Sequence, residues 1–481
     1  MSSTEPFGNR ARTKIVATVG PACRAPERLR ELIEAGVDVL RLNMAHGTRE
    51  DQAAVVDDIR AISRETRNPV GILVDLAGPK IRLGEVTPDP LECQRGDLFH
   101  FVRGEPRQPR ELNCNYGRLI DELDPRDRLM LADGTVEMVV EEKHAEHVVC
   151  RVTSPGTLRS RQGINLPGVK LSVPAMNDTD LQNARWAAQA GVDFVSLSFV
   201  RSAADMLQLK QLLRDEGSAA MAIAKIEKPE ALRDLEAIVQ ASDGVMVARG
   251  DLGVEIDVAE MPVQQKRIIQ VCQAWNRPVI VATQMLDSMQ RSSLPTRAEV
   301  TDVANAILDG ADACMLSGET AIGRFPIESV QMMNRIMLST EASLQGRSTP
   351  WWQESHDQDS VHPITSAIVA GAGKIADQLG AKLVVVATHS GRTALAKAKR
   401  RDFISTVAVS DREATVRQMS LFWGITPLLD RPNDLQKDLI PFIENWGRAQ
   451  GVLQPRDRLV VIMGSLQDTD QHNQLLVHEL S

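Results

Sequence analysis

The 481-residue sequence is poor in aromatic side chains and has no excess of basic charge. It holds nine Phe, six Trp and one Tyr, too few for the stacking platforms that bind single-stranded nucleic acids. It has 55 Lys and Arg residues and 64 Asp and Glu residues, which gives a net charge of −9, and no run of five like charges occurs. We therefore expect neither a nucleic acid nor an anionic membrane as a partner.

Long apolar runs and paired cysteines are also missing. No apolar run approaches the roughly 18 residues of a membrane-spanning helix, and the N-terminal segment lacks the apolar core of a secretion signal. The six cysteines are scattered and form no C-x-x-C motif, which argues against a disulfide framework and against a zinc site. These absences predict a cytoplasmic protein with reduced, mostly buried thiols.

Short β-branched runs alternate with amphipathic stretches from residue 13 onward. Eight such runs, each followed by a helical pattern, are expected between residues 14 and 320, with Gly36 ending the first helix and Asn177-Asp178 opening another. Eight βα units over about 250 residues predict a (β/α)₈ TIM barrel. A doubly wound open sheet is the competing topology.

Two further domains are predicted around this barrel. Residues 82–171 show short apolar runs between turn residues and no helical pattern, which predicts a small β-rich domain inserted into the barrel. Near residues 343–363 the chain is polar and aperiodic, as linkers are, and strand and helix patterns then resume. The expected domains are therefore the barrel (1–81 and 172–345), the β-rich insert (82–171) and a C-terminal α/β domain (346–481).

Polar residues follow the predicted barrel strands at their carboxyl ends, where barrel enzymes place their active sites. They are Arg41, Asn43, His46, Asp75, Lys225, Glu227, Arg249, Asp251, Thr283, Ser317 and Glu319. Parallel strands end at one rim, so cationic groups and carboxylates are expected to meet at one mouth. We expect His46 and Arg249 to support the site rather than to react.

Lys225, Glu227 and Asp251 carry the most specific chemistry at this mouth. Residues i and i+2 of a strand share a face, so Lys225 and Glu227 should both point inward. Glu227 and Asp251, on neighbouring strands, can hold one Mg²⁺, and a lysine beside it suits a phosphate-bearing substrate. Backbone N–H groups at Gly250 and Asp251 could bind an anion. The alternatives are an ion pair that only plugs the barrel and an ordinary glycine turn.

Several long motifs resemble pyruvate kinase of the bacterial type, in order and throughout the barrel. They are TKIVATVGPA, RLNMAHG, DLAGPKIRLG, KIEKPEA, ARGDLGVEI, ATQMLDSM, PTRAEVTDVANAILDGAD and MLSGETAIGRFP. The resemblance implies a phosphotransferase that moves the phosphoryl group of phosphoenolpyruvate to ADP, giving pyruvate and ATP in the last step of glycolysis. It also implies a Mg²⁺ cofactor, with Mn²⁺ as a possible substitute, and a homotetramer. In the family, the insert at residues 82–171 would be a small β-barrel that acts as a lid, and the C-terminal domain would be regulatory.

The resemblance also implies roles for single residues. Glu227 and Asp251 would bind Mg²⁺, while Arg41 and Lys225 would contact the transferred phosphoryl group. Gly250, Asp251 and Thr283 would hold the substrate carboxylate, and Arg82 would contact nucleotide phosphate. Thr283, Ser317 and Glu319 could relay the proton that the enolate takes up, although Ser317 and Glu319 could equally serve only as hydrogen-bonding groups.

This chain departs from the family pattern at its potassium ligands. Asn43 and Asp75 remain, but the family's serine is Ala45, its threonine is Leu76 and its glutamate is Lys80. A carboxylate replaced by an ammonium changes local charge by two units, so Lys80 should repel K⁺ and stand in for it. We expect an enzyme that needs Mg²⁺ but not K⁺. The alternatives are that Lys80 points to solvent or pairs with Asp75.

A second departure lies in the lid, where Gln162 takes the place of a frequent lysine, so a lid contribution to phosphate binding there stays open. In the C-terminal domain, T-H-S-G-R-T resembles the family's effector loop. It predicts activation by a sugar monophosphate or AMP through Thr388, Ser390, Arg392 and Thr393, at a helix expected to begin near Thr393. His389 replaces the loop's lysine, which disfavours a bisphosphate. The alternative is a solvated turn.

Two other functions remain to be weighed. Barrel sites with Glu and Asp metal ligands also serve Mg²⁺-dependent aldolases or lyases that act on pyruvate enolates. Such an enzyme needs no nucleotide-phosphate arginine, so Arg82 disfavours it. A binding protein that senses sugar phosphates would not need the full set of charged strand ends.

Overall fold

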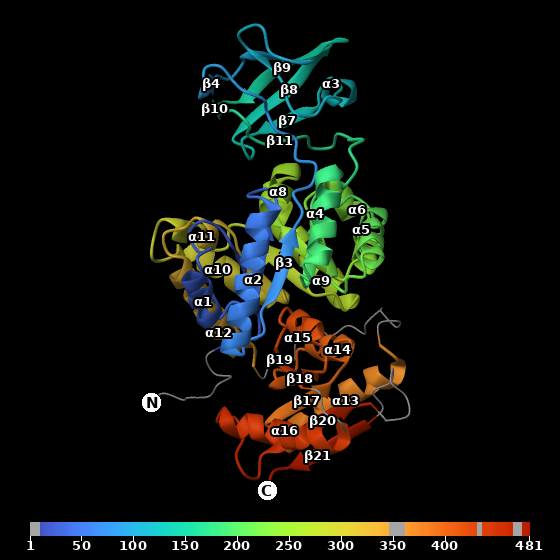
Figure 1. The fold of residues 1–481 in the computed structure, drawn as a ribbon. Coiled ribbons are helices and arrows are strands. Elements are labelled where there is room, and N and C mark those ends of the chain that lie inside the picture. The colour runs from blue at the N-terminus through green and yellow to red at the C-terminus, as the bar shows by residue number, and fades with distance from the viewer. Residues whose placement is uncertain (1–9, 346–360, 431–434, 465–473) are drawn as a thin grey trace.

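The computed structural model describes residues 10–345, 361–430, 435–464 and 474–481. Most of the predicted linker at residues 343–363 lies outside the described residues. Three bodies follow one another along the long axis of the molecule, with the β-rich insert at one end, the barrel in the middle and the C-terminal sheet at the other end (Figure 1). No helix among the described residues is long and apolar enough to cross a membrane.

Eight parallel strands close into a barrel in the order β1-β16-β15-β14-β13-β12-β3-β2. They are β1 (Lys14–Thr18), β2 (Val39–Asn43), β3 (Gly71–Asp75), β12 (Phe194–Leu197), β13 (Met221–Ile226), β14 (Gly244–Ala248), β15 (Val279–Ala282) and β16 (Ala313–Leu316). Every strand residue is buried except Asn43 and Met221, because side chains fill the barrel inside and helices cover it outside. The predicted (β/α)₈ barrel is confirmed, and the open doubly wound sheet is excluded by closure.

Several of the barrel helices begin at a side chain that caps them. The barrel helices are α1 (Pro26–Ala35), α2 (Arg49–Thr66), α4 (Asp178–Gln189), α5 (Ala203–Asp215), α6 (Pro229–Arg233), α7 (Leu235–Ala241), α8 (Arg249–Glu255), α9 (Met261–Ala274), α10 (Arg297–Asp309), α11 (Gly318–Ala321) and α12 (Pro326–Leu344). Those with a side-chain cap include α2, α4 and α10. Gly36 ends α1 in the left-handed region at φ 119°, and Asn177 caps α4, as predicted. The ordinary glycine turn, which is the alternative for Gly250 and Asp251, is wrong, because α8 begins directly at Arg249 and includes both residues.

The insert is β-rich, as predicted, and contains one short helix, α3 (Leu119–Glu122), that the sequence did not indicate. Its strands are β4 (Leu91–Cys93), β5 (Leu98–Val102), β6 (Glu111–Leu112), β7 (Arg128–Leu131), β8 (Val136–Lys143), β9 (His147–Ser154), β10 (Gly156–Leu158) and β11 (Ile164–Asn165). They form a six-stranded sheet and a two-stranded ribbon rather than a single closed sheet, since the edge strands β6 and β11 are two residues long. Phe99 and Phe101 anchor a core of its own.

The C-terminal body is a five-stranded sheet in the order β19-β18-β17-β20-β21, with β21 antiparallel. Its elements are α13 (Pro363–Leu379), β17 (Leu383–Ala387), α14 (Arg392–Lys399), β18 (Thr406–Ser410), α15 (Glu413–Met419), β19 (Ile425–Leu429), α16 (Leu435–Ala449), β20 (Arg458–Met463) and β21 (Gln474–Glu479). The sequence indicated the three central strands. It missed both edges, because β19 contains a proline and β21 is mostly exposed.

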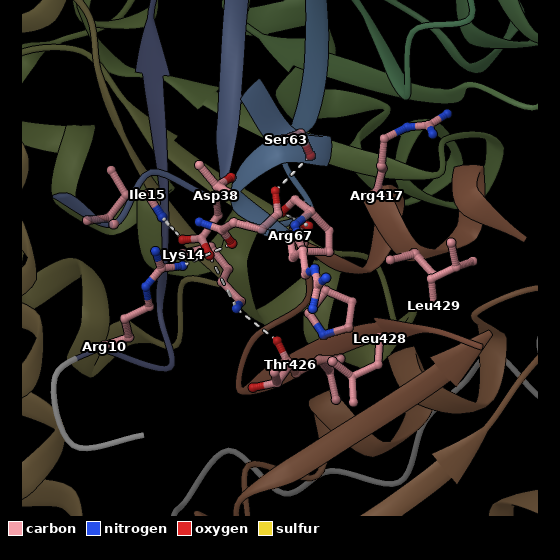
Figure 2. A pocket seen from close by; sticks show the side chains of 18 of the residues that line it. Arg10, Lys14, Ile15, Asp38, Ser63, Arg67, Arg417, Thr426, Leu428 and Leu429 are labelled. Carbon is pink, nitrogen blue, oxygen red and sulfur yellow. Dashed lines mark hydrogen bonds and ion pairs between the residues drawn. The ribbon is translucent and has the colours of Figure 1, made fainter. Parts of the chain in front are cut away.

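A cavity of about 1460 Å³ lies between the C-terminal body and the amino-terminal end of the barrel (Figure 2). Its lining includes several cationic side chains, namely Arg10, Arg12, Lys14, Arg60, Arg64, Arg67 and Arg417. Lys14 donates to the carbonyl oxygen of Ile425 at 2.9 Å and lies 3.5 Å from Asp38, so it ties strand β1 to strand β19. This end of the barrel is opposite to the carboxyl ends of its strands.

Candidate active site

The predicted site residues gather at the carboxyl ends of the barrel strands, on the side of the barrel that carries the lid (Figure 1). Asp75, the last residue of β3, lies at the centre. Its carboxylate accepts from Arg41 Nε at 3.0 Å and from Ser196 Oγ at 2.6 Å, and it pairs with a second Arg41 nitrogen. Burial alone would raise the pKa of Asp75, but Lys225 and Arg41 outweigh burial and hold that pKa below its usual range.

Lys225 is almost completely buried and is surrounded by acceptors. Its Nζ lies 2.7 Å from Ser198 Oγ, 2.9 Å from Glu227 Oε1 and 3.4 Å from Asp75 Oδ1. Burial disfavours the ammonium, but the carboxylates of Asp75 and Glu227 more than compensate, so the pKa of Lys225 is raised. The group is therefore a fixed positive charge at the mouth, and the predicted inward pair Lys225–Glu227 is present.

Glu227 and Asp251 form the predicted carboxylate pair. Burial raises the pKa of Glu227, Lys225 partly opposes this, and the neighbouring Asp251 carboxylate adds to it. A cation between the two carboxylates would stabilise their ionised forms and so oppose the effects of burial and of the Asp251 charge on the pKa of Glu227. Among the described residues, no three His, Cys, Asp or Glu side chains are grouped so that they could hold a metal. A two-carboxylate set suits Mg²⁺, which keeps waters and takes substrate oxygens, better than it suits a metal bound only by protein.

Lys80 reaches Asp251 from the segment that enters the lid. Its Nζ lies 3.7 Å from Asp251 Oδ1, and its side chain is 30% exposed. The two alternatives considered for it, a solvent-directed side chain and a pair with Asp75, are therefore wrong. A methyl group added to Gly163 of the lid would lie 2.9 Å from Lys80 Cε, so this glycine leaves room for the lysine.

Thr283, which directly follows β15, and Gly250, in the first turn of α8, lie next to each other. The Gly250 N–H, expected to be available to an anion, donates to Thr283 Oγ1 at 2.7 Å, and that hydroxyl donates to the Ala282 carbonyl at 2.6 Å. Thr283 has φ 70°, and Arg249 Nη2 donates to its carbonyl oxygen at 2.8 Å. Arg249 also pairs with Asp302 at 2.7 Å, which agrees with a supporting role. His46 is exposed; its backbone N–H donates to the Asn43 carbonyl at 3.2 Å and its carbonyl accepts from Gln52 Nε2 at 3.0 Å.

Ser317 and Glu319 differ in how they are engaged. The Glu319 carboxylate accepts from the backbone N–H groups of Leu286 at 3.0 Å and of Ser317 at 2.7 Å, and burial raises its pKa. Both of its oxygens therefore hold the loops that follow β15 and β16. Ser317 Oγ is buried and finds no hydrogen-bond partner within the described part of the chain. Of the two, only the serine hydroxyl is uncommitted.

Arg82 and Gln162 lie where the lid joins the barrel. Arg82 Nη1 donates to the Arg161 carbonyl at 3.3 Å, and its backbone N–H donates to Asn115 at 2.8 Å. The Gln162 side chain accepts from the Arg159 N–H at 2.7 Å, so its amide closes a local turn.

The two remaining candidate potassium ligands, Asn43 and Asp75, bind other protein groups. Asn43 Oδ1 accepts from the Ala45 N–H at 3.1 Å, and the Asp75 carboxylate is bound by Arg41 and Lys225. The residual pair Asn43 and Asp75 is therefore occupied by protein groups.

The predicted effector loop follows β17, and α14 begins at Arg392, one residue before the expected start. Thr388 Oγ1 accepts from the Gly391 N–H at 3.1 Å, and Arg392 Nε donates to Ser390 Oγ at 3.3 Å. Thr388 and Thr393 are buried, whereas Ser390 and Arg392 are exposed. His389 Nδ1 lies 2.7 Å from Asp411 Oδ1, which places a carboxylate beside the loop.

Sequence reasoning missed two serines and a buried aspartate that order the site. Ser196 and Ser198 on or next to β12 bind Asp75 and Lys225, and their alternation with Val195 and Leu197 in a buried strand was the available signal. Asp180, in the first turn of α4, accepts from the Gly78 N–H at 3.2 Å and so holds the segment that carries Lys80. No sequence pattern indicated this long-range contact.

Comparison with known proteins agrees with this geometry. The family model for the pyruvate kinase barrel domain matches residues 10–330, and the model for the pyruvate kinase alpha/beta domain matches residues 366–478. A pyruvate kinase of Corynebacterium glutamicum is 40% identical over 98% of this chain and 98% of its own length. One of Agrobacterium vitis is 39% identical over 95% and 94%, and pyruvate kinase 2 of Synechocystis is 43% identical over 95% and 77%. The chain therefore belongs to the pyruvate kinase family.

Proposed function

We propose that this site transfers the phosphoryl group of phosphoenolpyruvate to ADP, giving pyruvate and ATP. The observation that carries the proposal is the convergence of Arg41 and Lys225 on Asp75, beside the carboxylates of Glu227 and Asp251. Fixed positive charge next to a carboxylate pair is what phosphoryl transfer needs, because the reaction depends on positioning and charge neutralisation. Family membership gives no support to the aldolase or lyase alternative.

Each charged group has a role in this proposal. Glu227 and Asp251 hold Mg²⁺, which supplies charge neutralisation for the phosphoryl oxygens when bound. Arg41 and Lys225 hold the phosphoryl group, and Lys225 then stabilises the enolate left when the bond between phosphorus and the enol oxygen breaks. Arg82 contacts the nucleotide phosphates at the base of the lid. Thr283 and Gly250 receive the substrate carboxylate once the Thr283 hydroxyl releases the Gly250 N–H.

The enolate must then take up a proton at carbon to give pyruvate. Ser317 Oγ supports a relay role because no described group occupies it, and the Thr283 hydroxyl is close to the substrate position by virtue of its bond to Gly250. The two bonds that Glu319 makes to backbone N–H groups support the structural alternative for this residue. We therefore assign the relay to Thr283 and Ser317, with water completing it.

An assay of pyruvate and ATP formation from phosphoenolpyruvate and ADP tests the function. Activity should require ADP and Mg²⁺, and Asp251→Asn should abolish it while the melting temperature stays close to that of the wild type. Pyruvate release without ADP, or near wild-type turnover in Asp251→Asn, would contradict the assignment.

We also propose an effector site in the C-terminal body and a homotetrameric assembly. Ser390 and Arg392 are exposed beside a helix N-terminus, which supports a phosphate contact there, while Thr388 orders the loop from within. The Asp411 carboxylate beside His389 supports a sugar monophosphate or AMP over a bisphosphate. Val258, Val263, Leu294 and Ile322 are at least 64% exposed on the barrel, which supports burial against further copies in a homotetramer.

The effector proposal predicts that Ser390→Glu removes activation. The new carboxylate would repel a phosphate at this loop, whereas basal activity without effector should stay within about twofold, because the loop lies at the far end of the molecule from the barrel mouth. Titration of glucose 6-phosphate and AMP against wild type and variant measures this. An unchanged response in the variant would place the effector site elsewhere.

A further inference from the structure

A buried polar cluster joins the lid to the helix that carries Asp251. Glu255, the last residue of α8, accepts with its Oε1 from Asn165 Nδ2 at 3.1 Å and from Lys228 Nζ at 2.6 Å. Asn165 ends the lid strand β11, and Lys228 follows β13 next to Glu227. The Glu255 side chain is 1% exposed and that of Lys228 is 12% exposed. We call Glu255, Asn165 and Lys228 the lid cluster.

The same short helix touches the lid and the catalytic mouth. Asp251 lies in the first turn of α8, and Val254 lies one residue before Glu255. A methyl group added to Gly134, in the lid turn between β7 and β8, would lie 3.6 Å from both Val254 methyl groups. Five residues of helix, from Asp251 to Glu255, therefore connect a carboxylate at the mouth to the hydrogen bond with Asn165 of the lid, and Val254 lies under the lid turn at Gly134.

One oxygen of the lid cluster is unused. Glu255 Oε2 is buried and has no hydrogen-bond partner within the described residues. A buried acceptor without a donor destabilises the arrangement in which it occurs, and such groups are rare in folded proteins. A lid movement that brought a donor to Oε2 would regain that bond. The cluster is therefore unsaturated in this lid position and would favour a different one.

We propose that Glu255 is a positioning residue that sets the orientation of the lid over the barrel mouth, and with it the affinity for the nucleotide, without touching substrate. This rests on the proposed function, in which Arg82 contacts nucleotide phosphate. Arg82 and Asn165 lie on the two chain segments that join the lid to the barrel, so a change in lid orientation moves the nucleotide side of the site. Arg41 and Lys225, which hold the phosphoryl group of phosphoenolpyruvate in the proposed function, lie on the barrel strands β2 and β13, so a change in lid orientation leaves them in place.

The test measures the KM values for ADP and for phosphoenolpyruvate separately, in variants that exchange the amide of Asn165 and the carboxylate of Glu255. Asn165→Asp places a second carboxylate against Glu255, which should raise the KM for ADP at least tenfold while the KM for phosphoenolpyruvate stays within twofold. The double variant Asn165→Asp with Glu255→Gln restores one carboxylate and one amide beside Lys228. It should return the KM for ADP to within about threefold of the wild type. Glu236→Gln, which neutralises an exposed barrel carboxylate, is the matched control and should change neither KM.

Hydrogen exchange and thermal unfolding test the effect on the lid itself. Hydrogen exchange of the backbone amides at residues 163–173 should be faster in Asn165→Asp and restored in the double variant, with thermal unfolding as the check on folding. If Asn165→Asp does not fold, Asn165→Ala removes only the donor and should still raise the KM for ADP alone. Equal rises in both KM values, or no rescue in the double variant, would overturn the proposal. Loss of the wild-type reaction itself would instead refute the proposed function.

Discussion

At the scale of single residues, the site is a set of opposite charges that neutralise one another at short range. Lys225 and Arg41 keep Asp75 ionised although it is fully buried, and Asp75 in turn keeps both cations in place. A buried ion pair gives little net stability, because desolvation offsets the attraction. The arrangement is therefore better explained by the fixed positive potential that it offers a phosphoryl group than by a contribution to folding.

Lys225→Met tests this potential directly. The variant removes a charge that acts mainly on the transferring group, so kcat should fall on the order of 10²–10³-fold while the KM for phosphoenolpyruvate changes only a few-fold. Steady-state kinetics at saturating Mg²⁺ measure both constants, and circular dichroism checks the fold. A variant that raises KM and leaves kcat unchanged would show that Lys225 only binds substrate.

Lys80 should decide the requirement for a monovalent cation. Its ammonium lies 3.7 Å from Asp251, so the chain itself supplies a positive charge at this place. Wild-type activity in buffer that holds Mg²⁺ but neither Na⁺ nor K⁺ should therefore rise less than twofold when K⁺ is added. Lys80→Glu should lose most of its activity in that buffer and regain it with K⁺. Manyfold activation of the wild type by K⁺ would refute this role.

At the scale of elements, the segment after β3 is the part that local sequence signals describe least completely. Gly78 has φ 69°, and an added methyl group would lie 2.7 Å from the Phe199 ring and 2.9 Å from Ser198 Cβ. The Gly78 N–H is fixed by Asp180 on α4, and Ser198 Oγ donates to the Leu76 carbonyl at 2.6 Å. These contacts aim Lys80 and Arg82 from the barrel into the base of the lid.

Gly78→Ala should accordingly disturb the hinge more than an ordinary loop substitution would. A left-handed alanine costs about 1–2 kcal/mol, and the contact with Phe199 adds to that cost. We expect a loss of unfolding free energy of about 2 kcal/mol or more in urea titrations, together with a raised KM for ADP. Gly168→Ala is the control: its φ is 80°, but nothing lies within 4 Å of the added methyl, so only the backbone cost should appear. Equal losses in both variants would show that the Phe199 contact is unimportant.

The sequence predicted the elements whose signals are local. Buried β-branched runs indicated the eight barrel strands, Gly36 and Asn177 marked helix ends, and the alternation of Lys225 and Glu227 showed that both face inward. What it could not predict depends on contacts between distant segments. The bond from Gly250 to Thr283, the pairing of Lys80 with Asp251 and the commitment of Glu319 to two N–H groups each join residues that no local pattern connects.

At the scale of the whole molecule, buried ion pairs join the C-terminal body to the barrel. Asp312, which has no exposed surface, directly precedes strand β16, and it binds Lys399 at 2.6 Å and Arg401 at 2.9 Å. Lys399 ends α14, the helix that begins at the effector loop, while β16 ends at Leu316, directly before Ser317 at the mouth. One helix, one buried carboxylate and one strand thus connect the effector loop to the catalytic end.

Asp312→Ala should therefore destabilise the protein strongly and weaken its regulation. Removing the shared partner leaves two buried cations without compensation, which costs about 3–5 kcal/mol. Urea unfolding should show this loss, and activation through Ser390 and Arg392 should weaken because α14 is no longer fixed to β16. The control is Glu479→Gln, which breaks an ion pair at the surface: the Arg458 side chain is 45% exposed and that of Glu479 is 52% exposed. It should change the free energy of unfolding by less than about 1 kcal/mol. Full activation in a folded Asp312→Ala variant would show that the connection between the two ends runs elsewhere, because the path through α14 and β16 would then be broken without consequence.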